Sequence, residues 1–315
     1  MNFQSLSKIE KADWYIDLAF RNATKAANDC KSQKRAGPNT IKQADLAKIG
    51  AIKRVFRRHL DMILKSFPSI DTLPEFYQEL IRTTLDYAEL KKALGSIHWA
   101  QQKTDYFSDM YHEKIKKCQD FKRMTGYSRE YYGRISSVMK QVKKQLEYLE
   151  YARKTMKDFP SVKTSLFTVA IAGFPNVGKT TLLSKLTSAD PEIADYAFTT
   201  RGINIGYAKI NNHKVQFTDT PGSLDRFDKM NPIERQAQLV MKYCADVIIF
   251  VFDTSEATYD PDKQKKLLEN TKKMGKDVIV YLSKKDLTQH PDIPKFKEFY
   301  SSPEGIKKKV AELNQ

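Results

Sequence analysis

The stretch that most constrains the fold of this chain is GFPNVGKT at residues 173–180. It matches the pattern G-x-x-x-x-G-K-[ST], in which glycines let backbone N–H groups turn inward around phosphates. A short apolar run, LFTVAIA at 166–172, precedes it, and TTLLSKLTS continues from it with helical spacing. Because a phosphate loop of this kind joins a strand to a helix, the stretch predicts an α/β sheet around it.

The rest of the second half continues the alternation of strand and helix. Apolar runs at 247–253 and 277–283 are each followed by a segment with helical spacing, which is typical of a parallel sheet with helices on both faces. An Asn-Asn pair between two strand-like runs predicts a β-hairpin over 202–219 that adds one antiparallel strand. We therefore predict a P-loop nucleotide-binding domain over residues 164–315.

The first half, residues 1–163, has helical spacing almost throughout. Apolar stripes at steps of three, four and seven run through about 10–29, 41–66, 74–94, 96–124 and 135–156. Expected breaks lie at Gly37-Pro38, at the prolines around Asp71, and near Gly126. We predict an antiparallel bundle of long helices. Its aromatic residues, including Trp14 and Trp99, are interpreted as core rather than as stacking surfaces for nucleic-acid bases.

The charge is concentrated in the helical half. Residues 1–160 carry 31 Lys and Arg against 19 Asp and Glu, whereas residues 161–315 carry 23 against 19. A basic half favours a nucleic acid as the partner over a membrane, and a well-solvated helical surface is the alternative. A DNA partner is not expected. Three widely spaced cysteines fit neither a disulfide framework nor a metal site, and no apolar run reaches the length of a membrane span. Both features are typical of a cytoplasmic protein.

Within the phosphate loop, the expected roles follow from residue chemistry. Lys179 would reach the β- and γ-phosphates, and the Thr180 hydroxyl would hold Mg²⁺. The positive end of the helix dipole would add to the attraction for phosphate. The remaining nucleotide-binding positions expected here are Phe174, Pro175, Asn176, Val177, Gly178 and Thr181.

Two later motifs extend the predicted site. In YAFTTRG at 196–202, Thr200, rather than the threonine before it, would give its hydroxyl to Mg²⁺ while a γ-phosphate is present. In DTPG at 219–222, Asp219 would orient a Mg²⁺-bound water and the Gly222 N–H would bind the γ-phosphate. The expected Mg²⁺ residues are therefore Thr180, Thr200 and Asp219.

The segment SKKD at 283–286 indicates guanine as the base. Asp286 would accept hydrogen bonds from guanine N1 and the exocyclic amine, and Lys284 occupies its usual place. Guanine sites usually read N-K-x-D, so Ser283 stands where an Asn is expected. The ligands would be GTP and GDP, and FYSSPEG offers Ser301 and Ser302 near guanine O6.

Catalysis is expected to be slow without a partner. Many GTPases place a glutamine after the DTPG glycine to hold the attacking water, and here the residue is Ser223, which is too short. Asn176 stands where some related GTPases bind K⁺, and the alternative is that it only shapes the loop. The expected catalytic residues are Lys179, Thr200 and Asn176.

Taken together, these motifs resemble the Obg-related GTPases. The run IERQAQLVMKYCADVIIFVFDTSE at 233–256 narrows the resemblance to the nucleolar GTP-binding protein 1 family. The helical half agrees, since FPSIDTLPEFYQELI, LKKALGSIHWAQQ and KQLEYLEYAR resemble that family's N-terminal domain. The departures are Ser223, where members commonly carry an apolar residue, and SKKD in place of N-K-x-D.

The resemblance implies a GTPase switch in assembly of the large ribosomal subunit. Its partners would be the subunit precursor with its rRNA and other assembly factors. By motif position, the roles above fall on Lys179, Thr180, Thr200, Asp219 and Asp286. The chain looks like compact archaeal members without a long C-terminal extension. Two alternatives stay open: an RNA assembly scaffold that binds nucleotide with little turnover, and a GTPase acting on tRNA or in stress signalling.

Overall fold

The computed structural model describes residues 3–32, 38–187, 203–220, 232–255, 260–285, 296 and 298–314. The chain forms two compact units. One consists of Asn2–Thr72 and Ile81–Phe159, and the other of Leu73–Leu80 and Pro160–Gln315. Helix α3 (Glu75–Thr84) therefore contributes its first part to the second unit.

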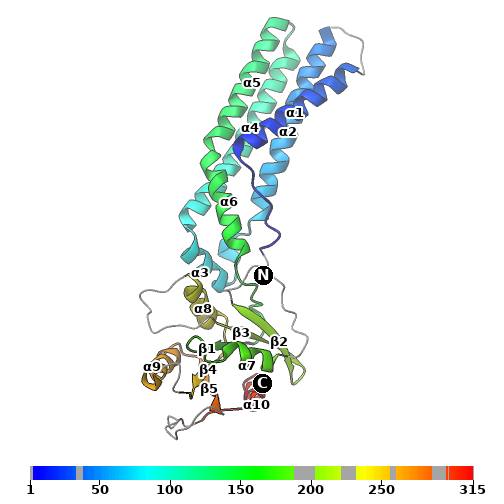
Figure 1. The fold of residues 1–315 in the computed structure, drawn as a ribbon. Helices are drawn as coiled ribbons and strands as arrows, with labels where there is room; N and C mark the ends of the chain where they lie inside the picture. Colours follow the sequence, from blue (N-terminus) through cyan, green and yellow to red (C-terminus); the bar gives the residue numbers. More distant parts are fainter. Residues whose placement is uncertain are drawn as a thin grey trace. The chain divides into compact units, whose positions relative to one another are not determined.

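The first unit is a helical bundle. Its helices are α1 (Ala12–Ser32), α2 (Pro38–Ser66), η1 (Ile70–Thr72), the end of α3, α4 (Tyr87–Lys117), α5 (Phe121–Gln141) and α6 (Lys143–Lys157). α2 packs between α1 and α4, and α4 also packs against α5 and α6 (Figure 1). Phe56, Tyr111 and Tyr131 are fully buried between them. The expected bundle of long helices is confirmed. No helix in the described ranges is long and apolar enough to cross a bilayer.

The helix boundaries differ from the expectation at two places. Asp86 ends the stripe expected over 74–94, because its side chain accepts a hydrogen bond from Glu89 N at 3.0 Å and starts α4. Asp120 starts α5 in the same way, through Lys122 N at 2.8 Å. Gly126 was expected near a break and instead lies inside α5.

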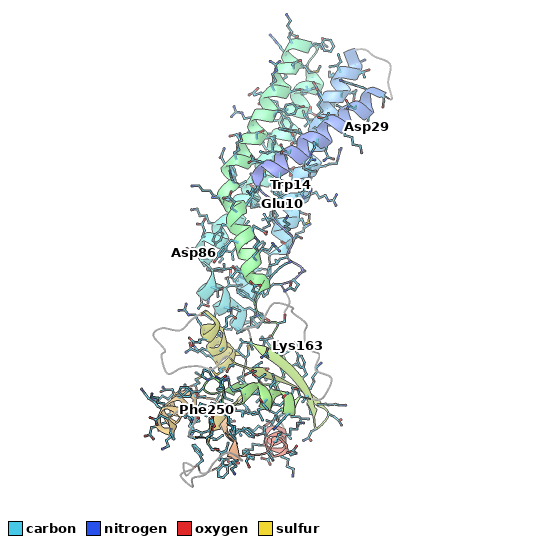
Figure 2. All side chains as sticks on the ribbon, in the orientation of Figure 1. Glu10, Trp14, Asp29, Asp86, Lys163 and Phe250 are labelled. Carbon is cyan, nitrogen blue, oxygen red and sulfur yellow. The ribbon has the colours of Figure 1, made fainter. Side chains whose placement is uncertain are left out.

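Not all the aromatic residues of the bundle are core residues. Tyr15 is 2% exposed and fulfils the expectation. Trp14, labelled on α1 in Figure 2, is 38% exposed, and Tyr106 is 58% exposed. Trp99 is only partly buried. Helical spacing therefore indicates which face of each helix is directed toward its neighbours. It overestimates how fully the aromatic side chains on that face are buried.

The second unit contains a five-stranded sheet in the order β2-β3-β1-β4-β5. The strands are β1 (Thr168–Ala172), β2 (Asn204–Ile210), β3 (His213–Asp219), β4 (Val247–Asp253) and β5 (Asp277–Ser283). β2 pairs with β3 antiparallel, and the other pairs are parallel. Asn211 and Asn212 have φ of 47° and 65°, the backbone that a tight hairpin turn requires. The predicted mixed sheet is confirmed.

The sheet is covered by helices and buried at its centre. The helices are α7 (Lys179–Leu186), α8 (Pro232–Tyr243), α9 (Pro261–Lys272) and α10 (Pro303–Leu313). Every residue of β1 and β4 is buried, including Phe250, which Figure 2 labels. Burial on both faces explains why these strands read as continuous apolar runs. The carboxyl ends of β1, β3, β4 and β5 meet at one edge, where α/β folds place their ligands.

Candidate functional site

The phosphate loop follows β1 at this edge and depends on glycine at its first position. Gly173 has φ of +144°, and a Cβ added there would lie 2.7 Å from Val251 O of β4. Asn176 and Gly178, with φ of 60° and 97°, curl the rest of the loop back toward α7. A side chain at residue 173 is thus excluded by both backbone conformation and space. The loop therefore reaches α7 as a compact turn.

Lys179, the first residue of α7, is a largely desolvated cation. It is 7% exposed, and its Nζ donates a 2.7 Å hydrogen bond to Phe174 O across the loop. Burial lowers the pKa of Lys179 to about 8, and the carboxylate of Asp219 opposes that shift. A multiply charged anion in the loop would favour the charged ammonium, so this lysine fits a phosphate ligand.

Thr180 and Asp219 place a hydroxyl and a carboxylate side by side. Thr180 Oγ1 donates to Asp219 Oδ2 at 2.5 Å, and Asn204 Nδ2 reaches the same oxygen at 3.3 Å. The other carboxylate oxygen, Asp219 Oδ1, is buried and has no hydrogen-bond partner within the described part of the chain. Mg²⁺ prefers oxygen ligands of these two kinds. The orphaned oxygen and the adjacent hydroxyl therefore fit a Mg²⁺ ion held beside the phosphate loop.

The segment after β5 lies against the phosphate loop. A Cβ added to Gly178 would be 3.9 Å from the Cβ of Ser283, which is itself 7% exposed. The Ser283 hydroxyl donates to Phe252 O at 3.2 Å, so it joins β5 to β4. Lys284 follows with φ of 56°, and its Nζ makes a 2.7 Å ion pair with Asp253 Oδ2.

Asp253, at the end of β4, is a site-edge residue that the sequence analysis missed. It is 2% exposed, and its Oδ1 accepts from Ser255 N at 2.9 Å and from Ser255 Oγ at 2.7 Å. The Gln264 side chain binds both the N–H and the carbonyl of Asp253. The ion pair between this carboxylate and Lys284 holds the chain in place directly after β5. A carboxylate ending an apolar parallel strand is a signal that could have identified it.

Other expected site residues are placed less tightly or not at all. Ser301 and Ser302 are exposed, and the Ser302 hydroxyl accepts from Gly305 N at 3.2 Å, which caps α10. Asn176 and Thr181 are exposed at the loop, while Val177 is buried beneath it. The residues outside the described ranges are Thr200, Gly222, Ser223 and Asp286. Within those ranges, no three His, Cys, Asp or Glu side chains cluster as a metal site.

The loop between β1 and α7, on a mixed sheet that follows a helical bundle, defines a P-loop GTPase with an added helical domain. Family models match the same two parts: a NOG1 N-terminal helical domain over residues 3–163, and a 50S ribosome-binding GTPase domain over residues 168–284. The chain belongs to the NOG1 family, as its sequence motifs predicted. A domain of this class binds GTP and GDP, typically with Mg²⁺, and hydrolyses GTP.

Individual relatives cover the chain to different extents. A protein of Methanocaldococcus jannaschii named only as uncharacterized is 35% identical over 90% of this chain and 81% of its own length. Nucleolar GTP-binding protein 1 of Drosophila melanogaster is 28% identical over 93% of this chain, which spans 45% of that relative. Among solved structures, the G domain of the T. maritima FeoB iron transporter is 26% identical over 48% of this chain and 99% of its own, with a TM-score of 0.40.

Proposed function

We propose that this protein is a GTP-dependent switch with slow intrinsic hydrolysis that acts during assembly of the large ribosomal subunit. The observation that carries the proposal is the union, in one chain, of a NOG1 helical domain with a GTPase domain of the 50S ribosome-binding kind. Residues 1–163 would bind the precursor, and residues 164–315 would bind the nucleotide. The three cysteines, all free, support a reducing compartment such as the cytoplasm.

In this proposal, the phosphates bind where the structure holds a desolvated cation. Lys179 would exchange its bond to Phe174 O for contacts with the β- and γ-phosphates. Thr180 and Asp219 would hold Mg²⁺, which neutralises charge on the phosphate oxygens. Thr200 and Gly222 would join them on the γ-phosphate side by their motif positions. Lys179→Ala should abolish tight nucleotide binding, and equilibrium titration with a fluorescent GDP measures this.

Guanine would be read by the segment after β5. Asp286 would accept from the ring N–H and amine, while the Lys284–Asp253 ion pair and the Ser283 hydroxyl hold the strand ends that lead into it. Ser301 and Ser302 lie in the segment expected near guanine O6. Asp286→Asn should shift the preference from guanine toward xanthine nucleotides. If xanthosine diphosphate binds the variant no better than the parent, the assignment of Asp286 is wrong.

Hydrolysis would depend on help that Ser223 does not supply. Phosphoryl transfer needs positioned water and positive charge, and we propose that K⁺ bound through Asn176, or docking on the precursor, supplies what is missing. Single-turnover hydrolysis in K⁺ and in Na⁺ tests this for the parent, Ser223→Ala and Asn176→Ala. Equal hydrolysis rates in both salts would exclude a catalytic role for K⁺. A loss of about a hundredfold in Ser223→Ala, about 2.7 kcal/mol of barrier, would make that serine catalytic.

RNA would be bound through exposed arginines of the helical unit. Arg54, Arg57 and Arg58 are exposed on α2, at the three- and four-residue spacing that places them on neighbouring positions of one face. Replacing all three with Gln should weaken rRNA binding and flatten its salt dependence by at most about three units of slope. As a matched control, replacing three exposed lysines of α9, Lys263, Lys265 and Lys272, should leave that slope unchanged.

Sedimentation with large-subunit precursors distinguishes the proposal from its alternatives. A GTPase switch should co-sediment with a non-hydrolysable GTP analogue and dissociate with GDP. A scaffold with little turnover would bind equally with both nucleotides and release no phosphate at steady state. A GTPase that acts on tRNA or in stress signalling would not co-sediment in either state.

A further inference from the structure

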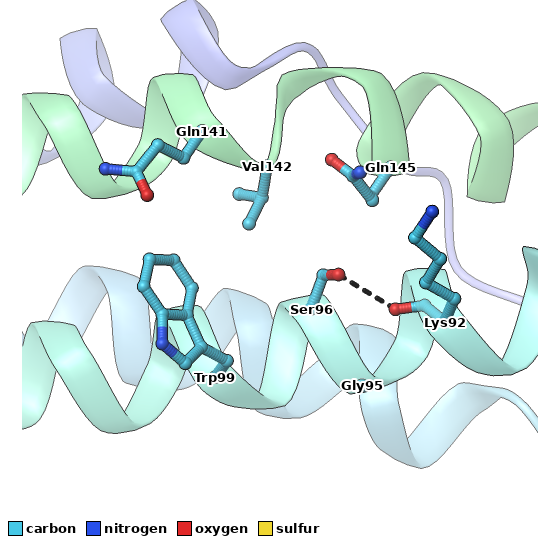
Figure 3. A pocket seen from close by; sticks show the side chains of 7 residues that line it. All are labelled: Lys92, Gly95, Ser96, Trp99, Gln141, Val142 and Gln145. Carbon is cyan, nitrogen blue, oxygen red and sulfur yellow. Dashed lines mark hydrogen bonds between the residues drawn. The ribbon is translucent and has the colours of Figure 1, made fainter.

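A groove on the helical unit has no role in the function proposed so far. It is an open depression of about 390 Å³ between α4 and the junction of α5 with α6. Its lining includes Lys92, Gly95 and Trp99 on α4, facing Gln141, Val142 and Gln145 (Figure 3).

Two local features shape the walls of the groove. Val142, with φ of −97° and ψ of 12°, interrupts the helix between α5 and α6 without a proline or glycine. On the opposite wall, Gly95 has no side chain, and a Cβ added there would meet nothing within 4 Å. Gly95 therefore leaves this part of the α4 wall without a side chain beside Trp99.

The groove offers a flat aromatic ring and one unsatisfied polar atom. Trp99 is partly buried, and its indole faces the groove (Figure 3). Gln145 belongs to the opposite wall (Figure 3), and its Oε1 is buried without a hydrogen-bond partner in the described part of the chain. Gln141 uses its amide nitrogen on Ser137 Oγ at 3.3 Å. Because a buried carbonyl without a partner is unfavourable, Gln145 suits a ligand that donates a hydrogen bond.

The rim of the groove is positively charged. Lys92 lines it, and its contact with Glu89 is a long, exposed ion pair at 3.7 Å that a phosphate could replace at little cost. Lys140, Lys143 and Lys144 do not line the groove, but they neighbour Gln141 and Gln145 in the sequence, and all three are exposed. An aromatic ring beside backbone-binding cations is the arrangement that single-stranded nucleic-acid sites use.

We propose that this groove binds one unpaired base of RNA, which stacks on Trp99. Lys92 and the three lysines next to Val142 in the sequence bind the flanking phosphates. The proposal rests on the RNA-binding part of the proposed function and names a subsite for it. It also reverses the interpretation of Trp99 as core.

The orphaned oxygen of Gln145 predicts which base is preferred. An acceptor at this position pairs with an exocyclic amine, which cytosine carries and uracil lacks. At the same ring position uracil carries a carbonyl oxygen, which would face the acceptor unfavourably. The two pyrimidines have the same size, so their comparison tests the group at this position with little change in stacking. We expect cytosine to be preferred by about threefold to tenfold, the ratio expected from one net hydrogen bond.

The test uses the full chain with Trp14→Phe, so that Trp99 is its one tryptophan. Quenching of its fluorescence by short oligo(C) and oligo(U) reports on the groove, and polarisation of labelled RNA reports total binding. Oligo(C) should quench saturably and more tightly than oligo(U), and Gln145→Leu should remove the difference. In the Trp14-containing parent, Trp99→Leu should weaken RNA binding by about tenfold, while Trp99→Phe should retain most of it.

The outcomes separate this proposal from the proposed function. Polarisation could show RNA binding without any quenching of Trp99, with Trp99→Leu binding RNA as tightly as the parent. In that case the groove is not the subsite, and RNA binding by the helical unit remains supported. If no RNA binds even at low salt, the RNA-binding part of the proposed function fails, and the subsite with it. If Trp99 responds to an aromatic peptide and not to RNA, the occupant is a protein and the proposal is overturned.

Discussion

Glu150 joins α6 to the N-terminal segment at Ile9, and its replacement by glutamine should lower stability in a pH-dependent way. Its two oxygens accept from Arg153 Nε at 2.7 Å and Nη2 at 2.8 Å, and Oε2 also accepts from Ile9 N at 3.0 Å. The side chains are 11% exposed for Arg153 and 19% for Glu150. Breaking a fully buried pair costs about 3–5 kcal/mol. The remaining exposure, and the hydrogen bond that an amide oxygen retains, reduce the expected loss to about 2 kcal/mol.

Tryptophan fluorescence measures this loss in the full chain. Both tryptophans, Trp14 and Trp99, belong to the helical unit, so a thermal transition followed at their emission reports on that unit alone. For a domain of this size, about 2 kcal/mol corresponds to a fall in Tm of roughly 4–8 °C. The matched control is Asp61→Asn, which removes an exposed pair with Lys65 and should leave Tm within experimental error.

The pH dependence identifies the cause. Burial of Glu150 opposes ionisation, but the hydrogen bonds from Arg153 and Ile9 outweigh it and lower the pKa of Glu150 below 4.5. Its stabilising effect is therefore complete above pH 4.5 and is lost as the pH falls through the lower folded-state value. The gap between parent and Glu150→Gln should close on acidification. A gap that stays constant from neutral to acid pH, or one no larger than the control's, would refute the reasoning.

Three further predictions follow from the second unit. Gly173→Ala should weaken GDP binding by about tenfold or more, because its Cβ would meet Val251 O. Gly275 also has a positive φ, of +73°, but a Cβ there would meet nothing within 4 Å, so Gly275→Ala should leave GDP binding unchanged. Titration with a fluorescent GDP measures both variants. Burial raises the pKa of the Cys244 thiol to about 12, so a maleimide at neutral pH should label it only after denaturation, and mass spectrometry would reveal any earlier labelling. Removing Mg²⁺ with a chelator should weaken GTP binding strongly in the parent and little in Asp219→Asn; equal effects would exclude Asp219 from the ion site.

The strands and the phosphate loop could be predicted because their signals are local. β4 and β5 were expected at 247–253 and 277–283 and lie there, since buried parallel strands are continuous apolar runs bounded by polar residues. The loop motif is defined over eight consecutive residues and requires only the strand before it and the helix after it. Such features depend on neighbours along the chain, so the sequence contains them directly.

Other features depend on distant partners and could not be predicted in this way. An apolar stripe continues through a short interruption, so it does not reveal that Asp86 and Asp120 end one helix and begin the next. Spacing shows which face of α4 carries Trp99, but not that a break at Val142 opens a groove opposite it. Asp253 acquires its role from Lys284, which lies on another strand's end. The roles of Thr200, Gly222 and Asp286 stay predictions from their motifs.

The membership of Leu73–Leu80 in the second unit sets the order in which the chain can fold during its own synthesis. Phe76, Tyr77 and Leu80 are at most 1% exposed, and the Tyr77 hydroxyl donates to Pro160 O and Val162 O. These partners emerge from the ribosome long after the segment itself. At about 5–20 residues per second, residues 81–162 take roughly 4–16 s to be made. During synthesis the apolar segment 73–80 is therefore exposed before its partners exist. A fragment that begins at residue 164 would lack this segment of the second unit.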